Sequence, residues 1–258
     1  SLIRIINRIT APDSGEVRLE GRPLRKEDLF HIGYLPEERG LYPKMKVGEQ
    51  AIYLARLKGL SKSDAQQRVK EWFERLEITS WWDKRVEELS KGMQQKVQFV
   101  TTVVHEPRLL IFDEPFSGFD PVNAEVLKRE ILALKARGTT LMLSTHNMQS
   151  VEELCDDITL INRAEVVLSG QTAEIRRAHG SHTARVVYEG EISPTDLSHL
   201  NILEHEEREY SKILRVQLQP KEELRSIIGQ LPSAIHLQSI ELEYPSMHEI
   251  FLATVQAK

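Results

Sequence analysis

The stretch Leu109-Leu110-Ile111-Phe112-Asp113-Glu114-Pro115 decides the fold class of this chain. Its four consecutive apolar residues are typical of a strand that is buried on both faces of a sheet. The segment Thr139–Leu143 is predicted to be a second buried strand, and the helix between the two begins at Pro121 and ends at Gly138. Buried strands that alternate with helices predict a doubly wound α/β fold with a parallel sheet.

The chain ahead of this stretch begins with a helical pattern and continues with short strands. Apolar residues spaced at i, i+3, i+4 and i+7 predict a helix with one buried face, formed by Leu2, Ile5, Ile6 and Ile9. Polar and apolar residues then alternate over 16–20, which predicts a half-exposed strand that ends at Gly21.

A helical subdomain is predicted over about residues 42–104. The segment before it, His31–Leu35, has the composition of a short strand that Pro36 ends. Within the subdomain, Ser61 followed by Asp64 is a helix-capping signal, and a further helix is expected over Lys91–His105.

The last third of the chain changes character. Residues 158–161 and 166–168 are expected to form the last strands of the first domain, which we place at residues 1–180. Residues 181–258 are expected to form a small α+β domain with an antiparallel sheet, whose predicted strands are 184–188, 213–218 and 236–243, with helices between the last two.

Composition excludes several classes of protein. Of the 258 residues, 28% are charged, which argues against a disordered chain, and no apolar run is long enough to span a bilayer. One cysteine, Cys155, rules out an internal disulfide and favours a reducing compartment. Residues 181–258 hold 12 acidic and 7 basic residues, which leaves 27 of each for residues 1–180, so neither part is a basic nucleic-acid binder.

The residues with the clearest chemistry are Asp113 and Glu114. A buried strand that ends in two carboxylates places them at the carboxyl edge of the sheet, where open α/β folds bind ligands. One carboxylate could hold Mg²⁺ and the other could orient or deprotonate water. A pair that merely caps the next element is about as common, so this motif alone leaves both interpretations open.

Two further motifs fit a phosphate site. Ser90 and Gly92 stand at the start of a predicted helix, where a hydroxyl and unpaired N–H groups can bind phosphate, although an ordinary Ser-capped helix has the same pattern. His146 follows the strand 139–143, and at the tip of that strand it could reach a phosphate oxygen.

Taken together in order and spacing, these motifs resemble the ATP-binding subunits of ABC transporters over about residues 1–180. Residues 245–252 also resemble, more weakly, the tail of ABC-2 exporter ATPases, a group that includes sodium-exporter-like subunits. The resemblance implies a P-loop NTPase-like parallel sheet with a helical subdomain, ATP and Mg²⁺ as ligands, and a homodimer that encloses two ATP molecules and drives a membrane permease. It also implies a cytoplasmic subunit held at the inner face of the membrane by that permease.

The same resemblance assigns the site residues one by one. It implies that Asp113 coordinates Mg²⁺, that Glu114 is the general base and that His146 senses the γ-phosphate. The residues that would bind the ATP of the opposite subunit are Ser90, Gly92 and Gln94, and Asp120 would lie at the subunit contact.

Two departures from the family pattern stand out. Glu37 occupies the position of a glutamine that binds Mg²⁺ and water, which adds a negative charge without excluding coordination. No G-x-x-x-x-G-K-[ST] phosphate loop (Walker A) occurs in the chain, and Ser1 resembles a residue just after that lysine and hydroxyl. We therefore expect an N-terminally truncated sequence.

The missing loop is expected to decide activity. Losing three or four hydrogen bonds to phosphate removes roughly 5–10 kcal/mol, whereas micromolar binding is worth about 8 kcal/mol in total. As written, the chain is expected to be inactive, although the complete protein would be an ATPase.

Two other functions remain open. One is a soluble ABC-type ATPase that acts on nucleic acid or ribosomes, against which the lack of a basic excess stands. The aromatic cluster at 72–82 is expected to pack within the subdomain, a more common role than a base-stacking platform. The other is a scaffold relative that does not hydrolyse ATP. Tyr42 and Met45 flank the region where the family docks its membrane partner, a role that rests on the resemblance alone.

Overall fold

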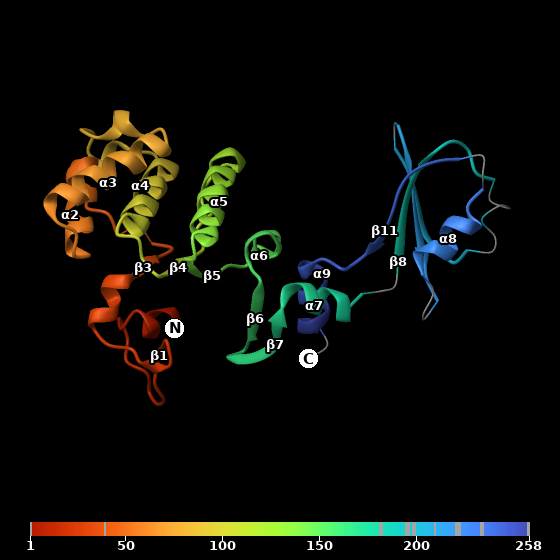
Figure 1. The fold of residues 1–258 in the computed structure, drawn as a ribbon, viewed down its shortest axis with the longest axis horizontal. Coiled ribbons are helices and arrows are strands. Elements are labelled where there is room, and N and C mark those ends of the chain that lie inside the picture. The colour runs from red at the N-terminus through yellow and green to blue at the C-terminus, as the bar shows by residue number, and fades with distance from the viewer. Residues whose placement is uncertain are drawn as a thin grey trace. The chain divides into compact units, whose positions relative to one another are not determined.

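The chain forms two compact units, Ser1–His146 and Asn147–Lys258, and each is described by itself (Figure 1). The computed structural model describes residues 2–38, 40–180, 183–193, 197, 200–208, 210–219, 223–232 and 235–256. The predicted division between residues 180 and 181 stays a prediction. Among these described residues, no helix combines the length and the apolar character that a membrane crossing requires.

The first unit is organised around a parallel sheet in the order β3-β4-β5. Its strands are β3 (Ile32–Leu35), β4 (Leu109–Asp113) and β5 (Thr140–Ser144). The central strand β4 is buried as its apolar run predicts, with Leu110, Ile111 and Phe112 almost inaccessible to solvent. Strand β5 pairs with β4 on one side. Thr140 is exposed and the other side chains of β5 are half-buried, so the expectation of a second buried strand is wrong.

The helical subdomain consists of three helices and two short 3-10 turns. These are α2 (Val47–Leu57), α3 (Lys62–Arg75), η2 (Thr79–Trp81), η3 (Val86–Glu88) and α4 (Lys91–Val103). The Ser61 hydroxyl caps α3 by accepting from the Asp64 amide at 3.1 Å, as predicted. The aromatic side chains of the subdomain make edge-to-face contacts with each other, Trp72 with Phe99 and Phe73 with Trp82. In this structure they therefore contribute to packing.

The start of the chain differs from its sequence pattern. Helix α1 (Leu2–Ile6) is one turn shorter than the apolar spacing predicts, and Leu2 and Ile9 are more than half exposed. The predicted buried face is therefore wrong. The strand pattern that follows is confirmed as β1 (Arg18–Leu19), which turns through Gly21 into β2 (Arg22–Pro23) and is followed by η1 (Glu27–His31).

Two basic side chains lie inside the first unit near the start of β3. Lys58, at the end of α2, donates to the carbonyl oxygens of Leu29 and Ile32 at 2.8 Å each, and burial lowers its pKa. His105 is buried with its Nε2 3.4 Å from the same Ile32 oxygen. Burial is the main reason that the pKa of His105 falls to about 4, and the nearby charge of Lys58 adds to it.

Helix α5 (Pro121–Ala136) completes the first unit and ends before Gly138, as predicted. The second unit starts with α6 (Met148–Leu154), the hairpin strands β6 (Asp157–Asn162) and β7 (Glu165–Gln171), and α7 (Thr172–Ala178). Strands β6 and β7 pair antiparallel with each other. They form a separate two-stranded sheet.

The predicted antiparallel sheet of the C-terminal region is confirmed in the order β11-β8-β10-β9. Its elements are β8 (Thr183–Glu189), β9 (Ile202–Glu207), β10 (Lys212–Gln217), α8 (Leu224–Gln230) and β11 (His236–Glu243). Strand β9 was not predicted, because its sequence Ile-Leu-Glu-His-Glu-Glu lacks a run of strand-forming residues. One face of the sheet packs around Ala184, Val186, Tyr188, Leu214 and Val216.

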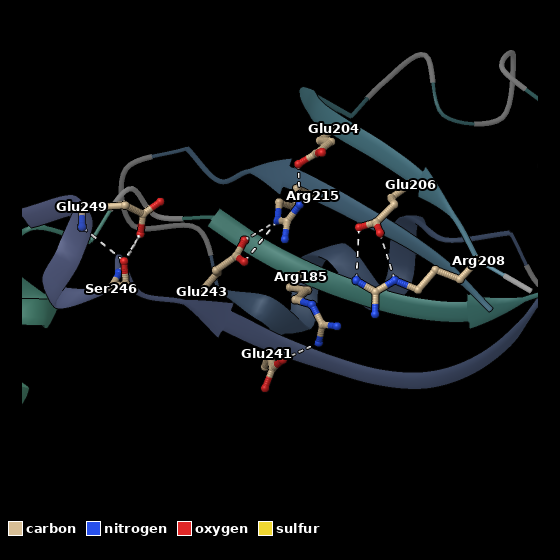
Figure 2. A network of polar contacts seen from close by, with 9 residues as sticks. All are labelled: Arg185, Glu204, Glu206, Arg208, Arg215, Glu241, Glu243, Ser246 and Glu249. Carbon is tan, nitrogen blue, oxygen red and sulfur yellow. Dashed lines mark hydrogen bonds and ion pairs between the residues drawn. The ribbon is translucent and has the colours of Figure 1, made fainter. Parts of the chain in front are cut away.

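The opposite face of this sheet carries ion pairs and is called here the polar face (Figure 2). Cross-strand pairing aligns Glu204, Arg215, Arg185 and Glu241 in one row across all four strands. Arg215 pairs with Glu204 and, at 2.9 Å, with Glu243, while Arg185 pairs with Glu241 at 2.8 Å. The carboxylates of the outer strands thus offset the repulsion between two arginines that lie directly opposite each other.

The last helix, α9 (Met247–Gln256), contacts α6 and α7. Ser246 and Glu249 form a capping box, in which the Ser246 amide donates to the Glu249 carboxylate at 2.7 Å (Figure 2). Met247 and Ile250 are buried against Ile175. Glu152 of α6 accepts from the Met247 amide at 2.6 Å, so a helix at the end of the chain is held by one that starts at residue 148.

Candidate active site

The three parallel strands of the first unit deliver polar residues to one edge of the sheet. In the register of the sheet Leu35 lies opposite Phe112 and Asp113 lies opposite Ser144. Because parallel strands end at the same edge, the segments that leave them come together there. Those segments contribute Glu37, Asp113, Glu114, Thr145 and His146, and we call this group the strand-end site.

Glu114 is the most constrained side chain of the strand-end site. Its Oε2 accepts a hydrogen bond from the Thr145 hydroxyl at 3.0 Å. Its Oε1 accepts from the His146 backbone amide at 2.9 Å and lies 2.7 Å from Nδ1 of the His146 ring. Both oxygens of the carboxylate are therefore held by the residues that follow β5.

The backbone of Glu114 explains how its side chain reaches β5. Its φ is +48°, in the left-handed region, and its amide donates to the Ser144 carbonyl at 2.9 Å. The chain thus turns sharply where β4 ends, at a cost of about 1 kcal/mol for a non-glycine residue. The turn directs the carboxylate towards the neighbouring strand.

Asp113 and His146 differ in their access to solvent. Asp113 is the last residue of β4 and is half-buried. The ring of His146 is 89% exposed although its Nδ1 contacts Glu114, which itself is only 19% exposed. A histidine held at one nitrogen and open at the other can bind a further group from solvent.

The charge of Asp113 also affects the pKa of Tyr34 on the neighbouring strand β3. Burial is the main reason that the pKa of Tyr34 on β3 is raised, and the charge of Asp113 raises it further. Arg4 acts in the opposite direction on the same phenol.

The loop Leu89–Gln94 runs into the first turn of α4, which begins at Lys91, and is shaped by its own side chains. The Ser90 hydroxyl caps α4 by accepting from the Met93 amide at 3.3 Å. Gln94 donates to the Val86 and Leu89 carbonyls at 3.2 and 3.0 Å, so its amide group is engaged within the loop. A Cβ on Gly92 would lie 4.0 Å from the ring of Phe119, which places this loop beside the segment after Glu114.

Asp120 has a local structural role in this structure. Its carboxylate caps α5 by accepting from the Asn123 amide at 3.0 Å and from the Asn123 side chain at 2.6 Å. The hydrogen bond from the Asn123 side chain is the largest cause of the lowered pKa of Asp120.

Two predicted site residues remain, Glu37 and Ser1. Glu37 is exposed, on the segment that leaves β3. Ser1 lies outside the described residues, so its predicted role in nucleotide binding stays a prediction.

Three residues near the strand ends were missed by sequence reasoning. Thr145 holds Glu114, Gln98 donates to the Pro36 and Glu38 carbonyls, and Gln95 lies 3.5 Å from the Pro115 carbonyl. The two glutamines are three residues apart on α4 and nearly inaccessible, at 2% and 4% exposure. Polar residues at core positions of a helix are the signal that could have identified them.

The donor set suits Mg²⁺ with phosphate better than a metal held by protein alone. Within the described ranges no three His, Cys, Asp or Glu side chains are arranged to hold a metal ion. Mg²⁺ is usually bound by one or two carboxylates together with water and phosphate oxygens. Asp113 and Glu37 are the carboxylates of the strand-end site that lack the engagement seen at Glu114 and fit that role.

Comparison with protein families gives two matches along the chain. Residues 1–117 match a family described as ABC transporter. Residues 170–255 match a family described as ATP-binding protein DrrA1-3-like, C-terminal domain.

Curated relatives and solved structures agree with these matches. The uncharacterized ABC transporter ATP-binding protein YhaQ of Bacillus subtilis is 41% identical over 98% of this chain and 84% of its own length. Nod factor export ATP-binding protein I of Paraburkholderia xenovorans is 32% identical over 65% of this chain and 56% of its own. A solved ATP-binding subunit of an ABC transporter superposes with a TM-score of 0.63 and 30% identity, covering 69% of this chain and 75% of that one.

Proposed function

Because the chain belongs to the family of ABC transporter ATP-binding proteins, we propose that its strand-end site hydrolyses ATP with Glu114 as the base for the attacking water. The resemblance drawn from the sequence and the P-loop NTPase-like fold are confirmed. The observation that carries the proposal is the clamp on Glu114 by Thr145 and His146. A carboxylate fixed in one orientation beside a solvent-open edge can accept a proton from a positioned water.

The other residues of the strand-end site would contact the metal ion and the γ-phosphate. Asp113 and Glu37 hold Mg²⁺, which when bound neutralises charge on the phosphate oxygens. His146 keeps Nδ1 on Glu114 and offers its exposed Nε2 side to the γ-phosphate. The same histidine thereby orients Glu114 and contacts the γ-phosphate when that phosphate is present.

The loop Leu89–Gln94 binds the ATP held by a second copy of the chain. It opens α4, a helix of 13 residues, with Ser90 and Gly92 exposed or half-exposed at its first turn. N–H groups at a helix start favour phosphate. Gln94 contributes by shaping the loop, because its amide donates to loop carbonyls, and Asp120 fixes the start of α5 close to the dimer contact.

The proposed partner is a membrane permease, and the proposed direction of transport is export. Export is carried over from the name of the Nod factor relative. An apolar surface made by Tyr42, Tyr53 and Leu57, each about half exposed, offers a contact area for the permease, since Tyr53 and Leu57 are one turn apart on α2 and Tyr53 contacts Tyr42. The two tyrosine rings pack edge to face at 6.4 Å, so part of this surface is preformed. Docking there would hold the chain peripherally at the inner face of the membrane.

Nucleotide affinity gives the first test. The 258 residues contain no G-x-x-x-x-G-K-[ST] motif, and we expect them to bind MgATP with a Kd well above micromolar. A chain that carries such a loop and its strand joined ahead of Ser1 should bind in the micromolar range. Calorimetry on both chains measures this. Tight binding by the 258 residues alone would contradict the proposed way of holding the phosphates.

Turnover gives the second test. In a chain that carries the phosphate loop, Glu114→Gln should lower kcat about 10²- to 10⁴-fold, because the amide cannot accept the proton. Glu125→Gln on α5, where the Glu125 side chain is 70% exposed and pairs with Lys128, is the matched control and should leave kcat unchanged. A Glu114→Gln protein with more than a tenth of normal turnover would refute the role of Glu114.

The proposed partner is tested by purification. The chain should copurify with a polytopic membrane protein, and Tyr53→Glu should weaken that association by placing a charge in the apolar surface. Recovery of RNA or ribosomes in place of a membrane protein would favour the nucleic-acid function instead.

A further inference from the structure

The contact pattern of Gln98 links α4 to the segment that presents Glu37. Its amide nitrogen donates to the Pro36 carbonyl at 3.2 Å and to the Glu38 carbonyl at 3.4 Å. The two acceptors flank Glu37 on either side. The sequence separation is about sixty residues, so this contact exists only through the tertiary fold.

Stability alone is a poor reason for an amide at this position. Gln98 is 4% exposed, and its Oε1 is a buried atom that has no hydrogen-bond partner within the described part of the chain. An apolar residue of similar volume would fill the space and remove the unsatisfied Oε1, but it would also remove the hydrogen bonds to the Pro36 and Glu38 carbonyls. What the amide adds over such a residue is a pair of donors aimed at the 36–38 segment.

Helix α4 contacts two segments of the strand-end site, so the hydrogen bonds donated by Gln98 act close to that site. Thr102 on the same face of α4 lies 3.5 Å from the Tyr34 carbonyl of β3, and Gln95 lies 3.5 Å from the Pro115 carbonyl. The face of α4 that carries Gln98 therefore follows the exit of β3 and the turn after Glu114. At its first residues the same helix carries Ser90 and Gly92.

We propose that Gln98 is a positioning residue for Glu37, holding the backbone on both sides of that carboxylate so that Glu37 meets Mg²⁺ or its bound water. This inference rests on the proposed ATPase function. It also makes α4 a rigid connection between the loop that grips the ATP of a second copy and the metal side of its own strand-end site.

The main experiment measures metal dependence in a chain that carries the phosphate loop. Gln98→Leu should raise the Mg²⁺ concentration for half-maximal turnover about tenfold, as loss of groups that orient a metal ligand commonly does. The Kd of Mn²⁺ for the ATP-bound protein, measured by electron paramagnetic resonance, should rise by the same factor. The melting temperature is measured alongside as a separate readout of folding, because the variant removes both the unsatisfied Oε1 and the two hydrogen bonds to the 36–38 segment.

The matched control is Gln50→Leu. Gln50 on α2 is completely buried, and neither side-chain polar atom has a hydrogen-bond partner among the residues described. It therefore tests the same substitution in the same subdomain without contacts to the 36–38 segment. Metal dependence should remain as in the unmodified chain.

A double-mutant cycle shows whether Gln98 acts through Glu37. In a Glu37→Ala background, Gln98→Leu should have no further effect on metal dependence. A shift of the same size in both backgrounds, or no shift in the Gln98→Leu single variant, would overturn the inference. If Gln98→Leu fails to fold, Gln98→Met, which keeps the side-chain length without a donor, is measured against the same criteria.

The two proposals fail in different ways. If Glu114→Gln retains turnover, the proposed function is wrong. If Glu114→Gln abolishes turnover and Gln98→Leu keeps normal metal dependence, only the role of Gln98 is wrong.

Discussion

Glutamate and aspartate gather in two regions of this protein, at the strand-end site of the first unit and on the polar face of the C-terminal sheet. On the polar face, Glu204 and Glu243 both pair with Arg215, and Glu241 pairs with Arg185. At the strand-end site, Glu114 is held by a hydroxyl, a backbone amide and a histidine ring. Within the described ranges, no Lys or Arg side chain forms an ion pair with Asp113 or Glu114.

The difference shows how surroundings assign roles to the same chemical group. A carboxylate neutralised by arginine is satisfied and has little left to offer a ligand. A carboxylate held by mostly neutral donors keeps its charge available for a metal ion or a proton.

The largest expected effect is on the stability of the buried core next to the strand-end site. Phe112, one residue before Asp113, is 1% exposed and stacks against Phe99 at 6.1 Å. Phe112→Ala should lower the free energy of unfolding of the first unit by about 3–5 kcal/mol. Urea denaturation with hydrogen exchange measures it, and Val122→Ala, at a position 74% exposed, is the control. A loss below about 1 kcal/mol would contradict the assignment of Phe112 to the core.

The next effect is the pH dependence of stability that the buried His105 of the first unit causes. The pKa of His105 is about 4 in the folded chain, against an ordinary value near 6.5 when unfolded. Between these values the unfolded chain binds a proton that the folded chain does not, so stability is present above pH 6.5 and falls as pH decreases towards 4. The loss at or below pH 4 is about 3 kcal/mol.

His105→Gln should remove this part of the pH dependence because glutamine does not titrate. Denaturation midpoints at pH 4 to 7 measure the change. His236, exposed on β11, is the control, and His236→Gln should leave the slope as it is. Equal slopes in the His105 variant and the unmodified chain would argue that His105 is solvated.

A smaller effect is expected for the attachment of the last helix. Glu152 accepts from the Met247 amide at 2.6 Å and pairs with Arg176 at 3.3 Å, and Arg176 also donates to the Pro245 carbonyl. Glu152→Ala should cost about 1–3 kcal/mol because it leaves charged and polar groups unpaired. Faster hydrogen exchange in α9 would report the loosened helix.

Glu153 provides the matched control for this attachment. It is exposed on the same helix and accepts from Gln149, one turn earlier. Glu153→Ala should leave exchange in α9 unchanged. If both variants have the same effect, the helix charge and not the contact with Met247 would be responsible.

The smallest effect is expected on the polar face itself. Arg185→Met with Glu241→Gln should change stability by about 0–1 kcal/mol, since the Glu241 side chain is 59% exposed and solvent screens the pair. Repeating the denaturation in 1 M NaCl should reduce even this difference. A cost of several kcal/mol would mean that the two regions differ less than their contacts indicate.

Much of the fold could be predicted because its signals are local. The apolar run at 109–112, the cap at Ser61 and the helix between Pro121 and Gly138 each depend on residues close in sequence. Strand β9 was missed because its pairing with β10, and not its own composition, makes it a strand. The apolar face of α1 was misjudged because spacing predicts which residues share a face but not whether anything covers it.

The candidate site divides in the same way. The sequence by itself determined that Asp113 and Glu114 end a buried strand, that helices begin at Ser90 and Pro121, and that His146 follows the next strand, because contacts between residues close in sequence and apolar runs set these features. Only the tertiary structure decided that Thr145 and His146 clamp Glu114 and that Gln98 holds the backbone around Glu37. Such contacts depend on strand register and on where a helix rests on the sheet, which no local pattern specifies.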